Sequence, residues 1–173
     1  MTLAGRTSAL ALAALLCLAG CSTTMDGQTT PVAGDAATEL RDSTAGDLRD
    51  VAVQAAEQTA VALTSLDHRD PGAGYDRLLA LLTDPARQEW EQRRIEYLGT
   101  LTSDVVTVNS AAVEASGVSA LDPAGPTATV LVAAIAEVST AQAPQPVKRR
   151  YRLQMSLVQT PAEWKVSQLQ FVP

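Results

Sequence analysis

The sequence has little with which to build a covalent or metal-centred active site. It contains two cysteines, Cys17 and Cys21, and one histidine, His68, among 173 residues. If Cys17 leaves with an N-terminal leader and Cys21 is modified, the folded part has no thiol, which excludes disulfides, zinc thiolate sites and cysteine nucleophiles there. A histidine-based metal site would need carboxylate ligands beside this single imidazole. We therefore expect no cofactor and no metal.

Aromatic residues and basic residues are also scarce. Aromatic side chains make up 3% of the chain, so Ala, Val and Leu carry most of its 46% apolar content. Loss of Arg6 with a leader would leave 12 basic against 19 acidic residues, a net charge of −7. A nucleic-acid ligand needs a basic surface to neutralise its phosphates, so we expect no nucleic-acid partner.

The N-terminal segment is typical of a bacterial lipoprotein. Residues 9–19 are almost all Ala and Leu, and the run ends in Leu18, Ala19, Gly20 and Cys21. It has the length of a signal peptide and is too short to span about 30 Å of hydrocarbon. We expect cleavage between Gly20 and Cys21, and acyl chains on Cys21 that anchor the protein in the membrane. Two alternatives stay open: an ordinary secretory signal cut near Ala19 and Gly20, which leaves a free thiol, and a transmembrane anchor, which needs a longer run.

Composition divides the chain into three parts. Residues 1–20 are the predicted signal peptide, residues 21–46 the lipidated cysteine and a flexible tether, and residues 47–173 one folded domain. The tether is rich in Thr, Gly, Ala, Asp and Ser, and a flexible chain of this length spans roughly 25–30 Å. Its last part, from Ala36, is compatible with an extension of the first helix.

Apolar periodicity predicts three helices in the first half of the domain. They cover residues 47–66, 75–82 and 84–100, the last opened by Asp84 as N-cap and Pro85 in the first turn. Apolar residues at helical spacing predict the inward faces. In the first helix these are Leu48, Val51, Ala55, Ala62 and Leu66, and in the third they are Trp90, Tyr97, Leu98 and Leu101.

The period then changes to two and predicts four strands. The first includes Val106, Val108 and Val113, with a bend or bulge near Asn109 and Ser110. The others cover residues 127–139, 147–159 and 164–172. Short connections indicate an antiparallel meander with the helices covering one face. The predicted class is α+β, three helices packed on a curved four-stranded antiparallel sheet, a cone-shaped fold of the nuclear transport factor 2 type.

Several stretches of the domain resemble the Mce-associated protein family of actinobacteria. The matching stretches are the short helix and turn at 75–83, a strand ending in Gly-Val at 105–118, a second strand at 129–133, and a closing hairpin at 150–158 and 164–169. The chain differs in having a lipobox where most members have a transmembrane helix, and an Asp-Pro after Thr83 where they have Gly.

The resemblance implies a cone fold, a place on the outer face of the cytoplasmic membrane and a non-catalytic supporting role. We therefore expect a membrane-anchored accessory lipoprotein that stabilises an Mce-type lipid or sterol import complex by contact with its subunits. One alternative is a carrier that holds a lipid or sterol in the cone. A second is a cone-fold enzyme of the isomerase or hydrolase type.

The residues offer two candidate sites besides Cys21. Lys148, Arg150 and Arg152 share one face of a strand, and they predict a contact with phospholipid head groups or an acidic partner unless neighbouring carboxylates neutralise them. A carrier would instead use side chains inside the domain. Its pocket would be lined by Trp90, Tyr97, Leu153 and Met155, which make a plain core equally well.

Acid–base candidates are few. His68 lies between Asp67 and Arg69, where a carboxylate could hold it as a general base, but the spacing favours a solvated turn. Asp104, Glu114 and Glu137 lie on or beside strands, and no pair among them has a spacing that requires catalytic work. We therefore expect no catalytic residue.

Overall fold

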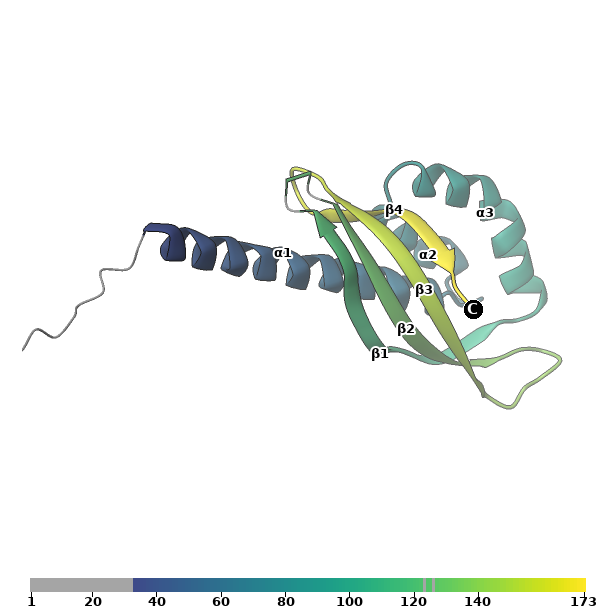
Figure 1. Ribbon diagram of the computed structural model, residues 1–173. Coiled ribbons are helices and arrows are strands. Elements are labelled where there is room, and N and C mark those ends of the chain that lie inside the picture. Colours follow the sequence, from purple (N-terminus) through teal and green to yellow (C-terminus); the bar gives the residue numbers. More distant parts are fainter. Residues whose placement is uncertain (1–32, 123, 126) are drawn as a thin grey trace, which may run out of the picture.

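Four strands form one antiparallel sheet in chain order. The computed structural model describes residues 33–122, 124, 125 and 127–173, so Gly20 and Cys21 lie outside the described residues. The strands are β1 (Thr107–Asp122), β2 (Thr127–Ser139), β3 (Val147–Gln159) and β4 (Trp164–Phe171). The sheet order is β1-β2-β3-β4, and the sheet is strongly curved (Figure 1). The meander confirms the predicted strand order, and the bounds of β2 and β3 match the prediction.

Strand β1 is the irregular member of the sheet. Its register with β2 shifts between Val108 and Ser110, which confirms the predicted bulge near Asn109. Two further shifts follow, between Val113 and Ala115 and between Val118 and Ala120. Each bulge adds local twist to an edge strand, and together they help β1 follow the curvature of the sheet.

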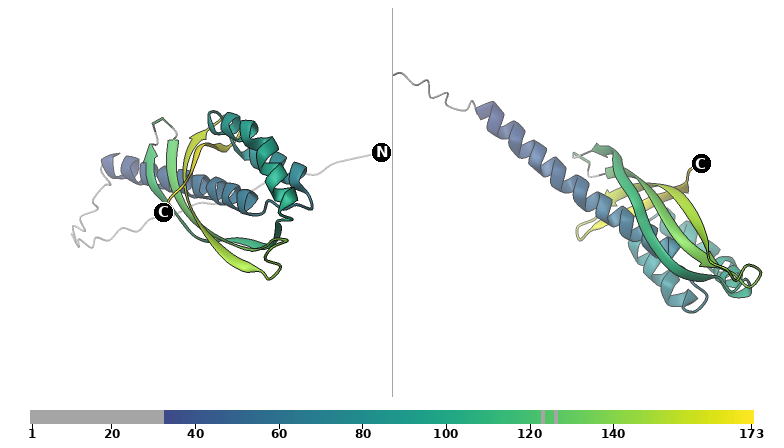
Figure 2. Two further views of the ribbon diagram at one scale, coloured as in Figure 1. Left: turned by 90° about the vertical axis from the view of Figure 1, so that its right-hand side faces the viewer. Right: turned by 90° about the horizontal axis from the view of Figure 1, so that it is seen from below.

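Three helices cover the concave face and complete the predicted α+β cone fold. They are α1 (Ala33–Thr64), α2 (Pro71–Leu81) and α3 (Ala86–Ser103). Figure 2 shows α1 running under the sheet and its N-terminal part extending beyond it. Helix α1 therefore begins well before residue 47, and residues 33–46 are helical, in agreement with the alternative that the end of the predicted tether extends the first helix. Ala, which has the highest helix propensity, is frequent in this stretch.

Of the predicted inward residues of the first helix, Leu66 is buried, Leu48, Ala55 and Ala62 pack partly against the core, and Val51 is wrong. Ala52, Ala56 and Ala60 are fully buried, whereas Val51 is 48% exposed. Small side chains let the helix axis approach the sheet closely, so the alanine stripe packs inward and the bulkier Val51 lies outside. The prediction for α3 holds better, because Trp90 and Leu101 are buried and Tyr97 and Leu98 pack partly against the core.

The turn before α3 corrects the predicted N-cap. The helix begins at Ala86, Pro85 precedes it, and no side chain caps it. Backbone contacts hold this turn instead. The Thr83 N–H donates to the Val166 carbonyl at 2.9 Å, and Leu82 forms a bridge with Val166 of β4. The α2–α3 turn is thus attached to one edge strand of the sheet.

The α1–α2 turn is attached to the opposite edge strand. The His68 N–H donates to the Val106 carbonyl at 2.8 Å, and the Val108 N–H donates to the Asp67 carboxylate at 2.7 Å. Helix α2 therefore runs between two attachment points, one on each edge of the sheet. We call these the β1 attachment (Asp67, His68) and the β4 attachment (Leu82, Thr83).

Candidate functional site

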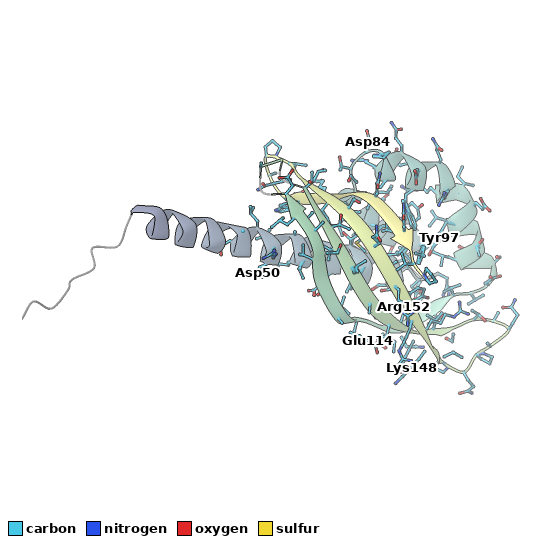
Figure 3. All side chains as sticks on the ribbon, in the orientation of Figure 1. Asp50, Asp84, Tyr97, Glu114, Lys148 and Arg152 are labelled. Carbon is cyan, nitrogen blue, oxygen red and sulfur yellow. The ribbon has the colours of Figure 1, made fainter. Side chains whose placement is uncertain are left out.

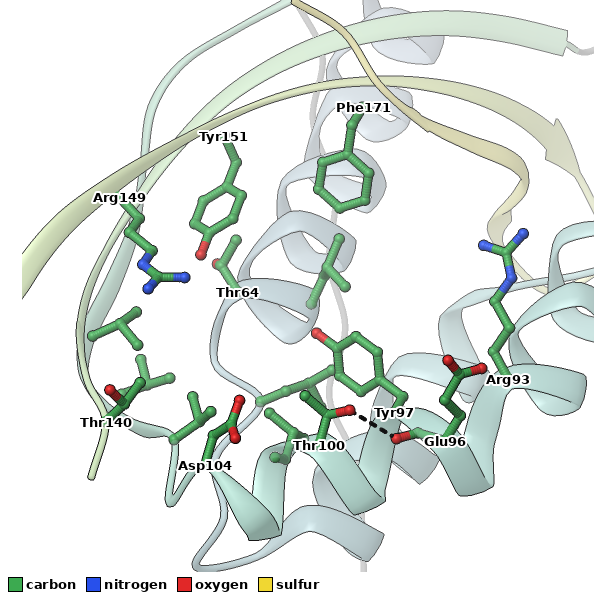
Figure 4. A pocket seen from close by; sticks show the side chains of 16 residues that line it. Thr64, Arg93, Glu96, Tyr97, Thr100, Asp104, Thr140, Arg149, Tyr151 and Phe171 are labelled. Atoms are coloured by element: carbon green, nitrogen blue, oxygen red, sulfur yellow. Dashed lines mark hydrogen bonds between the residues drawn. The ribbon is translucent and has the colours of Figure 1, made fainter. Parts of the chain in front are cut away.

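A cavity of about 560 Å³ lies between α3 and one end of the concave sheet face. This volume is within the range of about 300–1,000 Å³ that is usual for ligand sites. Figure 4 shows Arg93 and Tyr97 projecting from α3, with Tyr151, Arg149 and Phe171 opposite them on the strands. The full lining is Leu63, Thr64, Leu66, Arg93, Glu96, Tyr97, Thr100, Leu101, Asp104, Val106, Val108, Val138, Thr140, Arg149, Tyr151 and Phe171.

The predicted pocket needs correction at three of its four residues. Tyr97 lines the cavity, but Trp90, Leu153 and Met155 are 6%, 1% and 0% exposed and belong to the filled core. Trp90 is separated from the cavity by aromatic packing. Its ring centroid lies 5.9 Å from that of Tyr97 and 6.2 Å from that of Tyr75. At the packed part of the sheet, the side chains that point inward pack in the core and do not line a cavity.

The cavity is amphipathic. Arg93 and Arg149 supply positive charge, Glu96 and Asp104 negative charge, and Leu63, Val138 and Phe171 are among its apolar residues. Burial raises the pKa of the Tyr97 phenol, so this side chain is a neutral donor at physiological pH. Such a lining suits a ligand with apolar and charged parts.

Asp67, His68 and Arg69 form a structural clamp in place of the predicted solvated turn. The Asp67 carboxylate accepts hydrogen bonds from the Arg69 guanidinium at 2.7 and 2.9 Å and from two backbone N–H groups. His68 Nδ1 lies 2.9 Å from the Val106 carbonyl oxygen. Burial raises the pKa of Asp67, but the hydrogen bonds and the charge of Arg69 outweigh it and lower that pKa to about 2. An imidazole and a carboxylate held in this way fix the α1–α2 turn to the start of β1.

The basic residues of β3 are partly neutralised. Lys148 Nζ lies 3.8 Å from a Glu137 carboxylate oxygen, and Arg150 Nε lies 3.3 Å from one of Glu114. Arg152 takes part in no ion pair within the described part of the chain. Figure 3 places Glu114, Lys148 and Arg152 on the same part of the sheet. These pairings hold both carboxylates on the outer face, away from the cavity, whereas Asp104 lines it.

Sequence reasoning missed Arg149, Tyr151 and Phe171 as cavity residues. The alternation of β3 does place Arg149 on the same face as Tyr151, and that signal could have found it. The cavity exists because α3 lies at a distance from the sheet, and the periodicity of the sequence does not predict this distance. Among the described residues no three His, Cys, Asp or Glu side chains group as metal ligands, and no helix is long and apolar enough to cross a membrane.

Comparison with known proteins identifies the family. A family model described as "Uncharacterized protein Rv1363c/MT1408-like" matches residues 7–173, and the chain belongs to this family. No curated protein sequence matches the chain.

Several solved structures share the fold. The periplasmic domain of DotI is similar at a TM-score of 0.58 and 14% identity, over 70% of this chain and 92% of that one. An IcmL-like type IV secretion system protein from Legionella pneumophila gives 0.57 and 12%, over 70% and 89%. CagV of Helicobacter pylori, a VirB8 homologue, gives 0.55 and 11%, over 71% and 97%. Identities this low show a common fold and nothing further.

Proposed function

We propose that the protein is a membrane-anchored accessory lipoprotein on the outer face of the cytoplasmic membrane, which supports an Mce-type lipid or sterol import complex by protein contact. The fold supports a role of this kind, because it also forms the periplasmic domain of DotI and the VirB8 homologue CagV. The Mce partner rests on the sequence resemblance alone and stays a prediction, as does the lipid on Cys21.

The outer face of the sheet is the observation that carries the proposal. Leu131, Ala133 and Ile135 point outward in a row on β2, and Leu131 is 45% exposed. Arg150 lies opposite Ile135, and Arg152 lies opposite Ala133. An apolar row beside cations is a composition found at protein interfaces, where Arg is enriched. The uncovered face of an antiparallel sheet is usually polar, and this one is less so.

Helix α1 gives the domain a spacer. Within residues 45–64, Leu48 is the first residue of α1 to pack against the core. The preceding part of the helix, from Ala33, has a length of about 22 Å at 1.5 Å per residue. It leads toward the part of the chain that carries the lipobox. A helical spacer of this length would place the outer sheet face farther from the lipid anchor.

The test is site-specific crosslinking in the native host. A photoreactive amino acid replaces Leu131 on the outer face, and Ile95 in a matched strain, since Ile95 is 88% exposed on α3. We expect Mce-type subunits to crosslink at Leu131, not at Ile95, and to be lost with Cys21→Ala. Subunits captured equally at both positions, or none at either, would refute the proposal.

A second candidate function is a carrier for a lipid or sterol, favoured by the 560 Å³ amphipathic cavity. Mass spectrometry of organic extracts from the purified full chain tests it. A bound lipid that disappears in Leu101→Arg, where a charge fills the cavity, would support the carrier. Lipid-free protein, or equal lipid in the variant, would reject it.

We assign no catalytic role to Asp104, whose carboxylate accepts a hydrogen bond from Ser103 at 3.4 Å.

A further inference from the structure

Half of β3 has an open edge. Strand β4 pairs with β3 only from Leu153 to Gln159, and the Val172 N–H donates the last bond, 2.9 Å to the Arg152 carbonyl. Among the described residues, no strand pairs with residues 147–151 on the side away from β2. We call residues 147–151 the open edge.

The open edge presents main-chain groups in a fixed pattern. In an antiparallel ladder, each residue turns its N–H and C=O to one neighbour, and successive residues turn to opposite neighbours. Since Arg152 faces the β4 side, Arg150 and Lys148 face the same side, with their side chains on the outer face of the sheet. Unpaired groups of this kind are a template for an added strand.

The cavity lies beside the open edge. Arg149 and Tyr151, whose side chains alternate with those of Lys148 and Arg150, line it, and Phe171 at the end of β4 does so too. Phe171 is 58% exposed and Val147 is 52% exposed. Every second side chain of a strand added here would therefore enter the space between Tyr151 and Tyr97.

Charge indicates what kind of segment fits. Glu137 and Glu114 partly neutralise Lys148 and Arg150, whose side chains stay 66% and 72% exposed. Arg152 on the outer face takes part in no ion pair of the described residues, so this face offers a cation to the acidic side chains of an added strand. A second copy of this edge would bring like charges together, which disfavours self-association here.

We propose that the open edge and the cavity form one cleft, which binds an extended segment of a partner protein with alternating acidic and apolar residues as a fifth, antiparallel strand. The apolar side chains enter the cavity, and the acidic ones lie beside Arg150 and Arg152. This inference rests on the proposed protein-contact function and names the chemistry of the contact.

The first test uses the full chain purified in detergent and a fluorescent peptide, Glu-Leu-Glu-Leu-Glu-Leu, followed by fluorescence anisotropy. In the proposed register the Glu residues exchange main-chain bonds with Arg150 and Lys148, and the Leu N–H groups point away. Methylation of the Glu backbone nitrogens should therefore weaken binding about tenfold or more, equivalent to 1.4 kcal/mol. Methylation of the Leu nitrogens should change it by less than about twofold. Equal losses, the reverse order, or no binding at about 1 mM peptide would overturn the proposal.

Charge reversal gives the second test. Arg152→Glu, on the face that receives the acidic side chains, should weaken binding of the unmodified peptide about tenfold, while Arg49→Glu on α1 makes the same change in net charge without touching the cleft and should leave binding within about twofold. Circular dichroism checks that each variant folds. A similar loss in all variants would show non-specific attraction and overturn the proposal. So would a co-purified lipid that fills the cavity and blocks the peptide.

The two proposals fail separately. Crosslinking of Mce-type subunits at Leu131 with no binding of the peptide would leave the protein-contact function standing and remove the cleft. Peptide binding with the expected methylation pattern, but no crosslinks at Leu131, would keep the cleft and remove the outer sheet face as the contact.

Discussion

The two ends of the sheet differ in how completely the helices fill them. At the packed end, where β2 begins and β3 ends, Val130, Met155 and Leu157 are at most 1% exposed beneath the alanine stripe of α1. At the open end, where β2 ends and β3 begins, a cavity separates the sheet from α3. The two ends also differ in their strands, because β4 pairs only with residues 153–159 of β3. Aliphatic residues fill the packed end, whereas Arg93, Arg149 and Tyr151 line the cavity at the open end.

The largest effect that separates the two ends is expected from truncation of Leu157. Leu157→Ala leaves a cavity in a filled core and should lower the free energy of unfolding by about 3 kcal/mol. Phe171→Ala removes a larger side chain at the open end, but 58% of it is already exposed, so the loss should stay below about 1 kcal/mol. Urea denaturation of both variants measures the difference. Similar losses would show that the two ends are equally packed.

A smaller, pH-dependent effect is expected at the β1 attachment. Folding lowers the pKa of Asp67 from 3.8 to about 2, so the ionised carboxylate stabilises the folded state above pH 3.8 and this contribution is lost as the pH falls through about 2. The difference corresponds to about 2 kcal/mol. Asp67→Asn should therefore cost about 2 kcal/mol at pH 7 and little at pH 2, measured by urea denaturation at both pH values.

Asp70→Asn provides the matched control for the clamp. The Asp70 carboxylate is 60% exposed and lies 3.3 Å from Arg77, so its loss should change stability by less than about 0.5 kcal/mol. A deficit in Asp67→Asn that persists unchanged at pH 2 would contradict an ionic role for Asp67.

The aromatic cluster between the two ends predicts an effect of about 1 kcal/mol. The buried Tyr75 hydroxyl donates to the Trp90 carbonyl at 2.5 Å, and Tyr75→Phe removes this bond. Tyr97 borders the cavity, and its hydroxyl has no hydrogen-bond partner among the described side chains and backbone. Tyr97→Phe should therefore be neutral within about 0.3 kcal/mol in thermal unfolding. A larger loss of stability in Tyr97→Phe than in Tyr75→Phe would contradict the conclusion that only the Tyr75 hydroxyl makes a stabilising hydrogen bond.

The smallest effect is expected on the outer face at the open end. Arg150 is 72% exposed and pairs with Glu114, and an exposed pair of this kind contributes at most about 0.5 kcal/mol. Arg150→Ala should thus leave the urea midpoint nearly unchanged. A loss above about 1 kcal/mol would show that this face stabilises the fold, which would leave its cations less free for binding.

The packed end is also the part that the sequence predicts well. In β3 hydrophobic residues alternate with polar ones, which fixes both faces, and the turn residues that flank β2 and β3 fix their boundaries. In α1 the frequent alanines fit several helical faces equally well, and only contact with the sheet selects Ala52 over Val51 as the buried residue. The cavity depends on where α3 lies relative to β3, a distance that no periodicity encodes. Lipidation of Cys21 stays a prediction.

Helix α2 connects the two edges of the sheet. It runs from the β1 attachment to the β4 attachment, and its 11 residues give it a length of about 16 Å. The distance between the two edge strands therefore depends on the length of α2 as well as on the twist of the sheet. One extra helical turn in α2 would have to spread the edges or release an attachment. The number of residues in a short helix thus helps to set the distance between the two edges of the sheet.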